Sequence, residues 1–412
     1  MASAGDCPQA EALARSITDP AYQAKVLAAV AKGLAVTGAF RDAESLLTET
    51  ETLARSITDP SRQAREFAAL GTALAAAGER SQALTVLDRA EALARTAADP
   101  ESRAWALVAV GQALAATGAH RRAETLADTI TVPVGRARVL VTVGERWAMA
   151  GEHQQAVATL TNAADHVRTL PDPNDQEREL TEVVKALASA GACRQAEILA
   201  RSITHRVFDR AEGLAAVGQA LAAGGERERA AALLSEAETL ARTVTDPSST
   251  LAAVGQALAA CEEPERADAL LSEAETLARA VTDPSDQTYG LLAVARALVA
   301  CGERERAVAL LADAVVVART IADWRYQAQM LGLLGEELAA AGAWRQAEAL
   351  AHTITDPADQ VQVLTRLAKL VEPSWARQLI ARALRMEYWK FPLHSLGVVD
   401  PSVLVAAAAD VW

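Results

Sequence analysis

Two turn signals alternate along almost the whole of this 412-residue chain. The first is an Asp-Pro pair, with the aspartate at positions 19, 59, 99, 172, 246, 283 and 356, and Val132-Pro133 holds the same place in another repeat. The second is a glycine followed five residues later by an alanine, as at Gly78 and Ala83. Aspartate caps a helix N-terminus, proline fits the first helical turn, and glycine favours helix C-termini. The pattern therefore predicts a repeated hairpin of helix A, a Gly turn, helix B and an Asp-Pro turn.

Successive Gly markers are mostly separated by one of two spacings. One is 33 residues, as from Gly118 to Gly151, and the other is 40 residues, as from Gly38 to Gly78. The two spacings differ by about seven residues, which is close to two turns of an α-helix. An insertion of this length therefore lengthens a helix while the same face stays inward. The added segment falls in helix B. Glu262 stands where a Gly marker is expected, in a degenerate copy of the repeat. The sequence thus predicts an array of helices in which helix B varies by whole double turns.

Helix A carries a further small residue seven positions before the turn, at Gly71, Gly111, Gly144, Gly218, Gly255 and Gly335. A glycine inside a helix costs about 1 kcal/mol relative to alanine, so its recurrence predicts close contact between helices. The order Gly71, Gly78, Ala83, Ala90 resembles the tetratricopeptide repeat. The resemblance covers residues 5–386, but few of the family's aromatic positions are present and many units have 40 residues. It implies an all-α fold, a right-handed superhelical α-solenoid of about ten helix-turn-helix repeats whose A helices line a concave groove.

The repeat also predicts the organisation of the chain. Residues 1–19 are expected to form a lone N-terminal helix, either a half repeat or a cap, because the first Gly marker is Gly5. Residues 20–386 form the repeat array, and residues 387–412 form a C-terminal capping segment. The chain resembles the C-terminal repeat arrays of actinobacterial multidomain signalling proteins in two features: it uses arginine in preference to lysine, and it lacks the first helix A. That resemblance implies a sensor region and an N-terminal effector domain outside this chain.

Composition excludes several classes of protein. The chain contains 97 alanines and has a net charge of −13, which argues against binding nucleic acid or a membrane surface. It shows neither an apolar run long enough for a transmembrane helix nor a secretory signal. The four cysteines include no Cys-x-x-Cys pair, so reduced thiols and a cytoplasmic location are expected. Cys261 and Cys301 occupy equivalent positions one repeat apart and are expected to be buried free thiols.

No pattern of catalytic or metal-binding residues is found. The chain has no H-E-x-x-H helix, no G-x-S-x-G turn and no phosphate-binding loop, and its histidines are scattered. We therefore expect no enzyme activity, no cofactor and no metal. The acidic pairs of Ser235–Glu238 and Ser272–Glu275 fall on the outer face of helix B and are expected to form a solvated exterior.

One stripe of helix A is the candidate site. It comprises the residues six before and one after the helix A glycine, which share a helix face, and the family resemblance implies that this face lines the groove. In the first five units its basic residues number six and its acidic residues one. The candidate partner-binding residues on the stripe are Lys25, Lys32, Arg65, Trp105, Gln112, Arg138, Arg178, Lys185, Tyr289 and Arg296.

These features predict a non-catalytic scaffold or sensor module that binds a protein or peptide partner in the groove. The partner's bound segment would be acidic or phosphorylated, with Trp105 supplying apolar contact. In one alternative, the stripe cations pair with neighbouring carboxylates and leave the groove neutral. In another, the protein binds a small molecule in an interior pocket near Trp324, Trp344 and Trp389.

Overall fold

A computed structural model describes residues 40–245 and 247–368, together with a few single residues near both ends of the chain. Every regular element in these ranges is an α-helix. Residues 1–19 and 387–412, which the sequence predicts as a terminal helix and a cap, lie outside the described residues, as do Lys25, Lys32 and Trp389.

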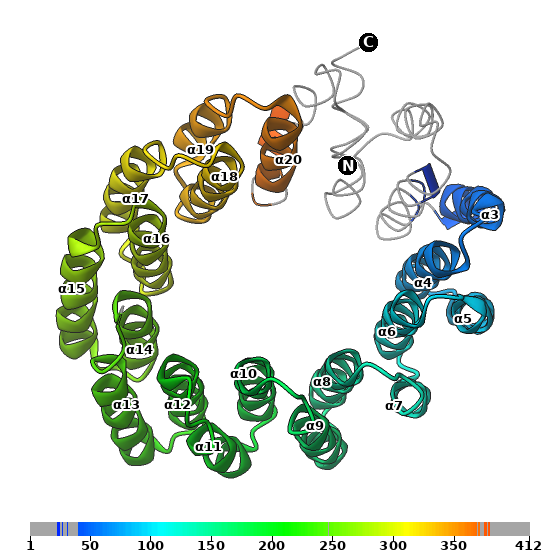
Figure 1. Cartoon of the computed structure of the whole chain (residues 1–412), viewed down its shortest axis with the longest axis horizontal. Coiled ribbons are helices and arrows are strands. Elements are labelled where there is room, and N and C mark those ends of the chain that lie inside the picture. The colour runs from blue at the N-terminus through cyan, green and yellow to red at the C-terminus, as the bar shows by residue number, and fades with distance from the viewer. Residues whose placement is uncertain are drawn as a thin grey trace. The chain divides into compact units, whose positions relative to one another are not determined.

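The helices alternate between A and B along the chain, and Figure 1 labels them. The A helices are α4 (Pro60–Ala76), α6 (Pro100–Ala116), α8 (Pro133–Met149), α10 (Pro173–Ser189), α12 (Val207–Ala223), α14 (Ser248–Ala260), α16 (Pro284–Ala300), α18 (Trp324–Ala340) and α20 (Pro357–Ala368). The B helices are α3 (Phe40–Ser56), α5 (Arg80–Thr96), α7 (His120–Ala127), α9 (His153–Val167), α11 (Cys193–Arg201), α13 (Arg227–Ala241), α15 (Pro264–Ala280), α17 (Arg304–Ala318) and α19 (Trp344–Ala351). The predicted all-α fold of successive helical pairs is confirmed.

The chain divides into two compact units, one of residues 1–139 with 347–412 and one of residues 140–346. Within the first unit, α4 packs against its own B helix, α5, and against the next A helix, α6. Within the second unit, α12 packs in the same way against α13 and α14. Figure 1 shows the two layers of the second unit, with α12, α14 and α16 in one and α13, α15 and α17 in the other.

Helix lengths follow the spacing of the Gly markers. The A helices α4, α6, α8, α10, α12, α16 and α18 all have 17 residues. The short B helices α7, α11 and α19 have 8 or 9 residues, whereas α9, α13 and α17 have 15. The prediction that helix B absorbs the seven-residue increment is confirmed.

Close packing between helices A and B is concentrated at the helix A glycines. A Cβ atom built on Gly71, Gly144 or Gly218 would lie 2.5–2.8 Å from the side chain of a leucine on the following B helix. Carbon atoms in contact are normally 3.5–4.0 Å apart. The leucines Leu87, Leu160 and Leu234 are fully buried. The glycine is therefore required by the leucine that rests on it, as the sequence predicted.

The turns between helices also follow the predicted chemistry. The Asp59 carboxylate accepts hydrogen bonds from the backbone N–H groups of Ser61 and Arg62, at 2.8 and 3.3 Å, and caps α4. The Gly markers at 78, 118, 151, 191, 225, 302 and 342 adopt positive φ values. Glu262, in the degenerate copy, keeps this conformation with a φ of 63° and is the one non-glycine residue with positive φ among the described residues.

The turn before α12 has no Asp-Pro pair and is stabilised differently. Glu177, on α10 and 4% exposed, accepts hydrogen bonds from the backbone N–H groups of Thr204, His205 and Arg206, at 2.6–3.0 Å. Burial alone would raise the pKa of Glu177, but these hydrogen bonds outweigh it and lower the pKa to about 2. A carboxylate of the preceding A helix thus binds the backbone of the turn that leads into α12, where no local aspartate is present.

The acidic residues of the B helices are not simply solvated, which corrects the expectation from sequence. Arg242, at the end of α13, donates to Glu238 at 2.7 Å and to Glu273 of α15 at 2.8 Å. Arg266 of α15 pairs with Glu238 as well, at 2.5 Å. Equivalent pairs join α11 with α13 through Arg201 and Glu236. The outer layer of the second unit is therefore linked from repeat to repeat by ion pairs.

Candidate partner-binding groove

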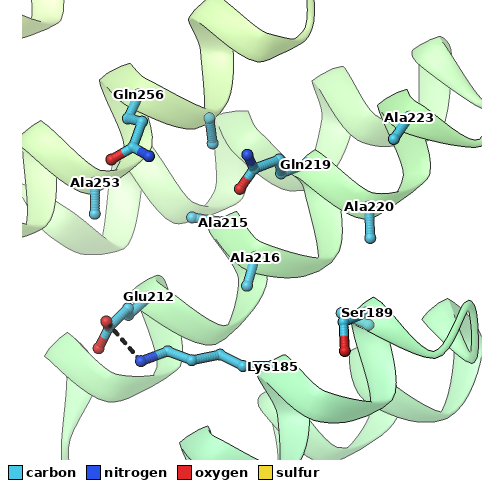
Figure 2. Close-up of a pocket in the computed structure, with 12 residues that line it drawn as sticks. Lys185, Ser189, Glu212, Ala215, Ala216, Gln219, Ala220, Ala223, Ala253 and Gln256 are labelled. Carbon is cyan, nitrogen blue, oxygen red and sulfur yellow. Dashed lines mark ion pairs between the residues drawn. The ribbon is translucent and has the colours of Figure 1, made fainter. Parts of the chain in front are cut away.

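In the second unit, three successive A helices enclose a groove of about 450 Å³. It is lined by α10, α12 and α14 alone, through Lys185, Ala188, Ser189, Glu212, Ala215, Ala216, Gln219, Ala220, Ala223, Ala253, Gln256 and Ala257. Seven of these residues are alanines, so a ligand can approach the helix backbones closely. The polar side chains stand above this floor, as Figure 2 shows.

Four residues of the groove, Lys185, Glu212, Gln219 and Gln256, belong to the stripe defined from sequence. The helical period therefore brings them to one surface, although they come from three different repeats. Only Lys185 is among the ten candidate residues.

Lys185 is held between two carboxylates. Its Nζ atom lies 2.9 Å from Glu182 on the same helix and 2.9 Å from Glu212 on α12, the latter pair being drawn in Figure 2. Burial alone would lower the pKa of Lys185, but the hydrogen bonds with Glu212 and Glu182 outweigh it and raise the pKa. The cation is thus compensated inside the groove.

A third carboxylate, Glu145 on α8, adds negative charge beside this pair. Partial desolvation raises its pKa, the charge of Glu182 adds to this effect, and Arg146 opposes it. Among the described residues, Glu145 forms no ion pair within 4 Å. Within the ion-paired cluster itself, the two carboxylates of Glu182 and Glu212 outnumber the single cation of Lys185, so the cluster has a net negative charge.

The other candidate cations of the second unit also have carboxylate partners. Arg178 lies 3.1 Å from Asp175 and 3.6 Å from Glu179, both on its own helix. Arg296 of α16 lies 2.6 Å from Glu337 of α18. Tyr289, one stripe position before Arg296, is 52% exposed. Arg178, Lys185 and Arg296 are therefore each paired with neighbouring carboxylates, as in the alternative in which the stripe cations are neutralised.

The first unit presents a different arrangement on its stripe. The guanidinium carbon of Arg138, on α8, lies 5.7 Å from the centre of the Trp105 ring on α6, within the range of a cation–π contact. Arg65, on α4, is exposed and its Nε donates to the carbonyl of Ser61 at 3.3 Å. Gln112, on α6, is exposed. The stripe here carries cations and an aromatic ring on neighbouring helices.

The remaining reactive side chains do not assemble. Within the ranges that the structure describes, no three His, Cys, Asp or Glu residues are placed to hold a metal ion. Cys261 and Cys301 end α14 and α16 and are half-buried rather than buried, and desolvation raises the pKa of both thiols. Trp324 is 52% exposed beneath Arg325. Neither Trp324 nor Trp344 lines the groove.

Comparisons with known proteins add few constraints. No protein-family model matches the chain, and no curated protein matches it. Among solved structures, Ton1535 from Thermococcus onnurineus NA1 is 17% identical, over 87% of this chain and 94% of that one, with a TM-score of 0.31. A Rap protein complexed with competence and sporulation factor is 13% identical, over 81% of this chain and all of that one, with a TM-score of 0.30. A circular tandem repeat protein is 11% identical over 97% and 98%, with a TM-score of 0.26.

These similarities are too distant to indicate a function, and the fold assignment depends on the helices themselves. Among the described helices, none has the length and apolar character needed to cross a bilayer.

Proposed function

We propose that this chain is a non-catalytic scaffold or sensor module that binds a protein or peptide partner along the stripe of its A helices. The observation that carries the proposal is the groove of the second unit, because all its lining residues come from A helices and four of its five polar members, all but Ser189, are stripe residues. The resemblance to tetratricopeptide repeats supports the same reading. An origin among the C-terminal arrays of actinobacterial signalling proteins, with a cytoplasmic location, would fit a sensor role.

The stripe of the first unit is proposed to receive an acidic or phosphorylated segment. Arg65 and Arg138 supply positive charge, and Trp105 offers a flat apolar face beside Arg138. Arginine and aromatic residues are the types that most often dominate the binding energy of protein interfaces. Lys25 and Lys32 belong to the same proposal from sequence.

Fluorescence anisotropy tests this proposal with labelled oligoglutamate and phosphoserine peptides as probes. Arg65→Glu and Arg138→Glu are each expected to weaken binding about tenfold or more, and added salt should weaken binding to the wild-type protein. Arg121, an exposed residue of α7 in the same unit, provides a matched control as Arg121→Glu. If Arg65→Glu and Arg138→Glu bind the probes as tightly as the wild type and the Arg121→Glu control, the stripe is excluded as the binding surface.

A pocket for a small molecule near the tryptophans is the second candidate. Trp324 and Trp344 line neither the groove nor the smaller cavity of about 280 Å³ near Arg103. The groove of the A helices is the better-supported site because four stripe residues from three repeats line it together.

A further inference from the structure

Two sets of glutamines on the A helices have different surroundings. Four glutamines in first turns bind a main-chain carbonyl at the end of the preceding B helix. Gln63, Gln176, Gln287 and Gln327 donate in this way to Ala54, Arg168, Arg279 and Arg319, at 2.7–2.9 Å. These four amides join one hairpin to the next.

The glutamines that follow the helix A glycine are different. Gln219 and Gln256 line the groove, and neither forms a hydrogen bond within the part of the chain that the structure describes. Their amides extend from neighbouring helices into the space above the alanine floor (Figure 2). A side-chain amide offers both a donor and an acceptor, the complement of a peptide group. The pair can therefore bind a main chain that passes across the helices.

The spacing of the helices fits an extended peptide. Adjacent packed helices lie about 8–10 Å apart, and an extended chain advances about 3.3 Å per residue. Gln219 and Gln256 would then meet peptide groups about three residues apart. The floor residues Ala216 and Ala253 leave room for the main chain to lie close to the helices.

The charge of the surface indicates which side chains the peptide carries. Lys185 is already paired with Glu182 and Glu212, and these two carboxylates leave the three-residue cluster with one excess negative charge. Of these carboxylates, Glu182 has a side chain that is 58% exposed and can accept a second cation. An acidic peptide would be repelled at this point, and a basic side chain would be attracted.

We propose that the groove of α10, α12 and α14 binds an extended peptide segment, with Gln219 and Gln256 bonding its main chain and Glu182 pairing with a lysine or arginine side chain. This proposal depends on the proposed function, that the A-helix face binds polypeptide, and it assigns to the second unit a ligand charge opposite to that of the first.

An array of randomised peptides of about nine residues, long enough to cross three helices, tests the proposal with the full-length protein. The wild-type protein is expected to select peptides with a lysine or arginine, and the best of them is then measured in solution. Gln219→Met combined with Gln256→Met should weaken its binding about tenfold or more, since two hydrogen bonds to the main chain are lost. The variant Gln287→Met, which removes one of the inter-hairpin hydrogen bonds, should leave the affinity unchanged.

Glu182→Gln should reduce the preference for the basic peptide about threefold to tenfold, with circular dichroism confirming that the helices remain. Glu228, exposed on the B helix α13, provides the matched control as Glu228→Gln.

Three outcomes would overturn the inference. Selection of acidic peptides that depends on Arg65 but not on Gln219 would overturn it while leaving the proposed function intact. Selection of basic peptides that the groove variants bind as well as the wild type would do the same. Selection of no peptide at all would overturn both proposals.

Discussion

Replacing Gly144 by alanine is expected to destabilise the repeat formed by α8 and α9, although alanine is the better helix former. The new Cβ atom would lie 2.5 Å from Cγ and 2.6 Å from Cδ2 of Leu160. Because Leu160 is fully buried, its side chain cannot turn out into solvent to avoid the contact without losing its buried surface. The substitution therefore forces a shift of about 1 Å between the two helices or of the leucine itself.

The magnitude follows from two opposing terms. Overpacking a buried contact of this kind costs about 1–3 kcal/mol. The removal of a glycine from a helix interior gains about 1 kcal/mol. The net loss of unfolding free energy is thus about 0–2 kcal/mol. In a Leu160→Ala background the clash is absent, so Gly144→Ala should stabilise by about 1 kcal/mol, which gives a coupling energy of about 1–3 kcal/mol.

The double-mutant cycle is measured by urea denaturation followed by circular dichroism. Since a repeat array can open locally, hydrogen exchange of the α8 and α9 amides supplies a second measurement. Gly151→Ala is the control, because Gly151 has a φ of 79° and an added Cβ would meet open space. Its cost of about 1 kcal/mol should be equal in both backgrounds. Effects of Gly144→Ala that agree within about 0.5 kcal/mol in the two backgrounds would refute the reasoning.

Three further predictions concern the turns and the outer layer. The pKa of Glu177 is lowered from 4.5 to about 2, so its ionised form stabilises the fold. This contribution is complete above pH 4.5 and is lost as the pH falls from 4.5 towards 2. Glu177→Gln should therefore cost about 3 kcal/mol near neutral pH and remove that pH dependence from urea titrations, whereas an unchanged acid transition would contradict the assignment. Glu262→Gly should raise the midpoint of thermal unfolding and the unfolding free energy by about 1 kcal/mol, because glycine adopts the left-handed backbone without strain. Gly302→Ala at the equivalent turn should lower the unfolding free energy by a similar amount, and a change of the same sign in both variants would contradict this. Arg242→Gln should cost about 1 kcal/mol or less at low ionic strength and nothing measurable in molar salt, so a loss independent of salt would point to packing instead of charge.

The sequence predicted the hairpin array well because its signals are local. An Asp-Pro pair or a glycine at positive φ acts within one turn of the backbone, and its recurrence gives the helix boundaries directly. The seven-residue increments likewise appeared in the B helices, as in the 8 residues of α7 against the 15 of α9. The carboxylate that holds the turn before α12 was not predictable in this way. Glu177 is 27–29 residues away from the N–H groups that it binds, and no local pattern joins them.

The site was predicted in part for a related reason. The helical period was sufficient to bring Lys185, Glu212 and Gln219 to one groove. The charge of that groove was not predicted, because the stripe counted only two positions in each helix. Glu182, three residues before Lys185 and on the same face, was left out and supplies one of the two carboxylates that compensate it. The partners of Arg296 and Arg178 in the same unit have to be identified from side-chain positions.

The variable length of the B helices has a consequence for how this protein can change. The B helices α9, α11 and α13 differ by about two turns, while the A helices α10, α12 and α16 all have 17 residues. The outer layer can therefore change in length without moving the side chains that face a ligand. The B helices can therefore be lengthened, shortened or changed on their exposed surface, for attachment or for solubility, without altering the A-helix residues that line the groove.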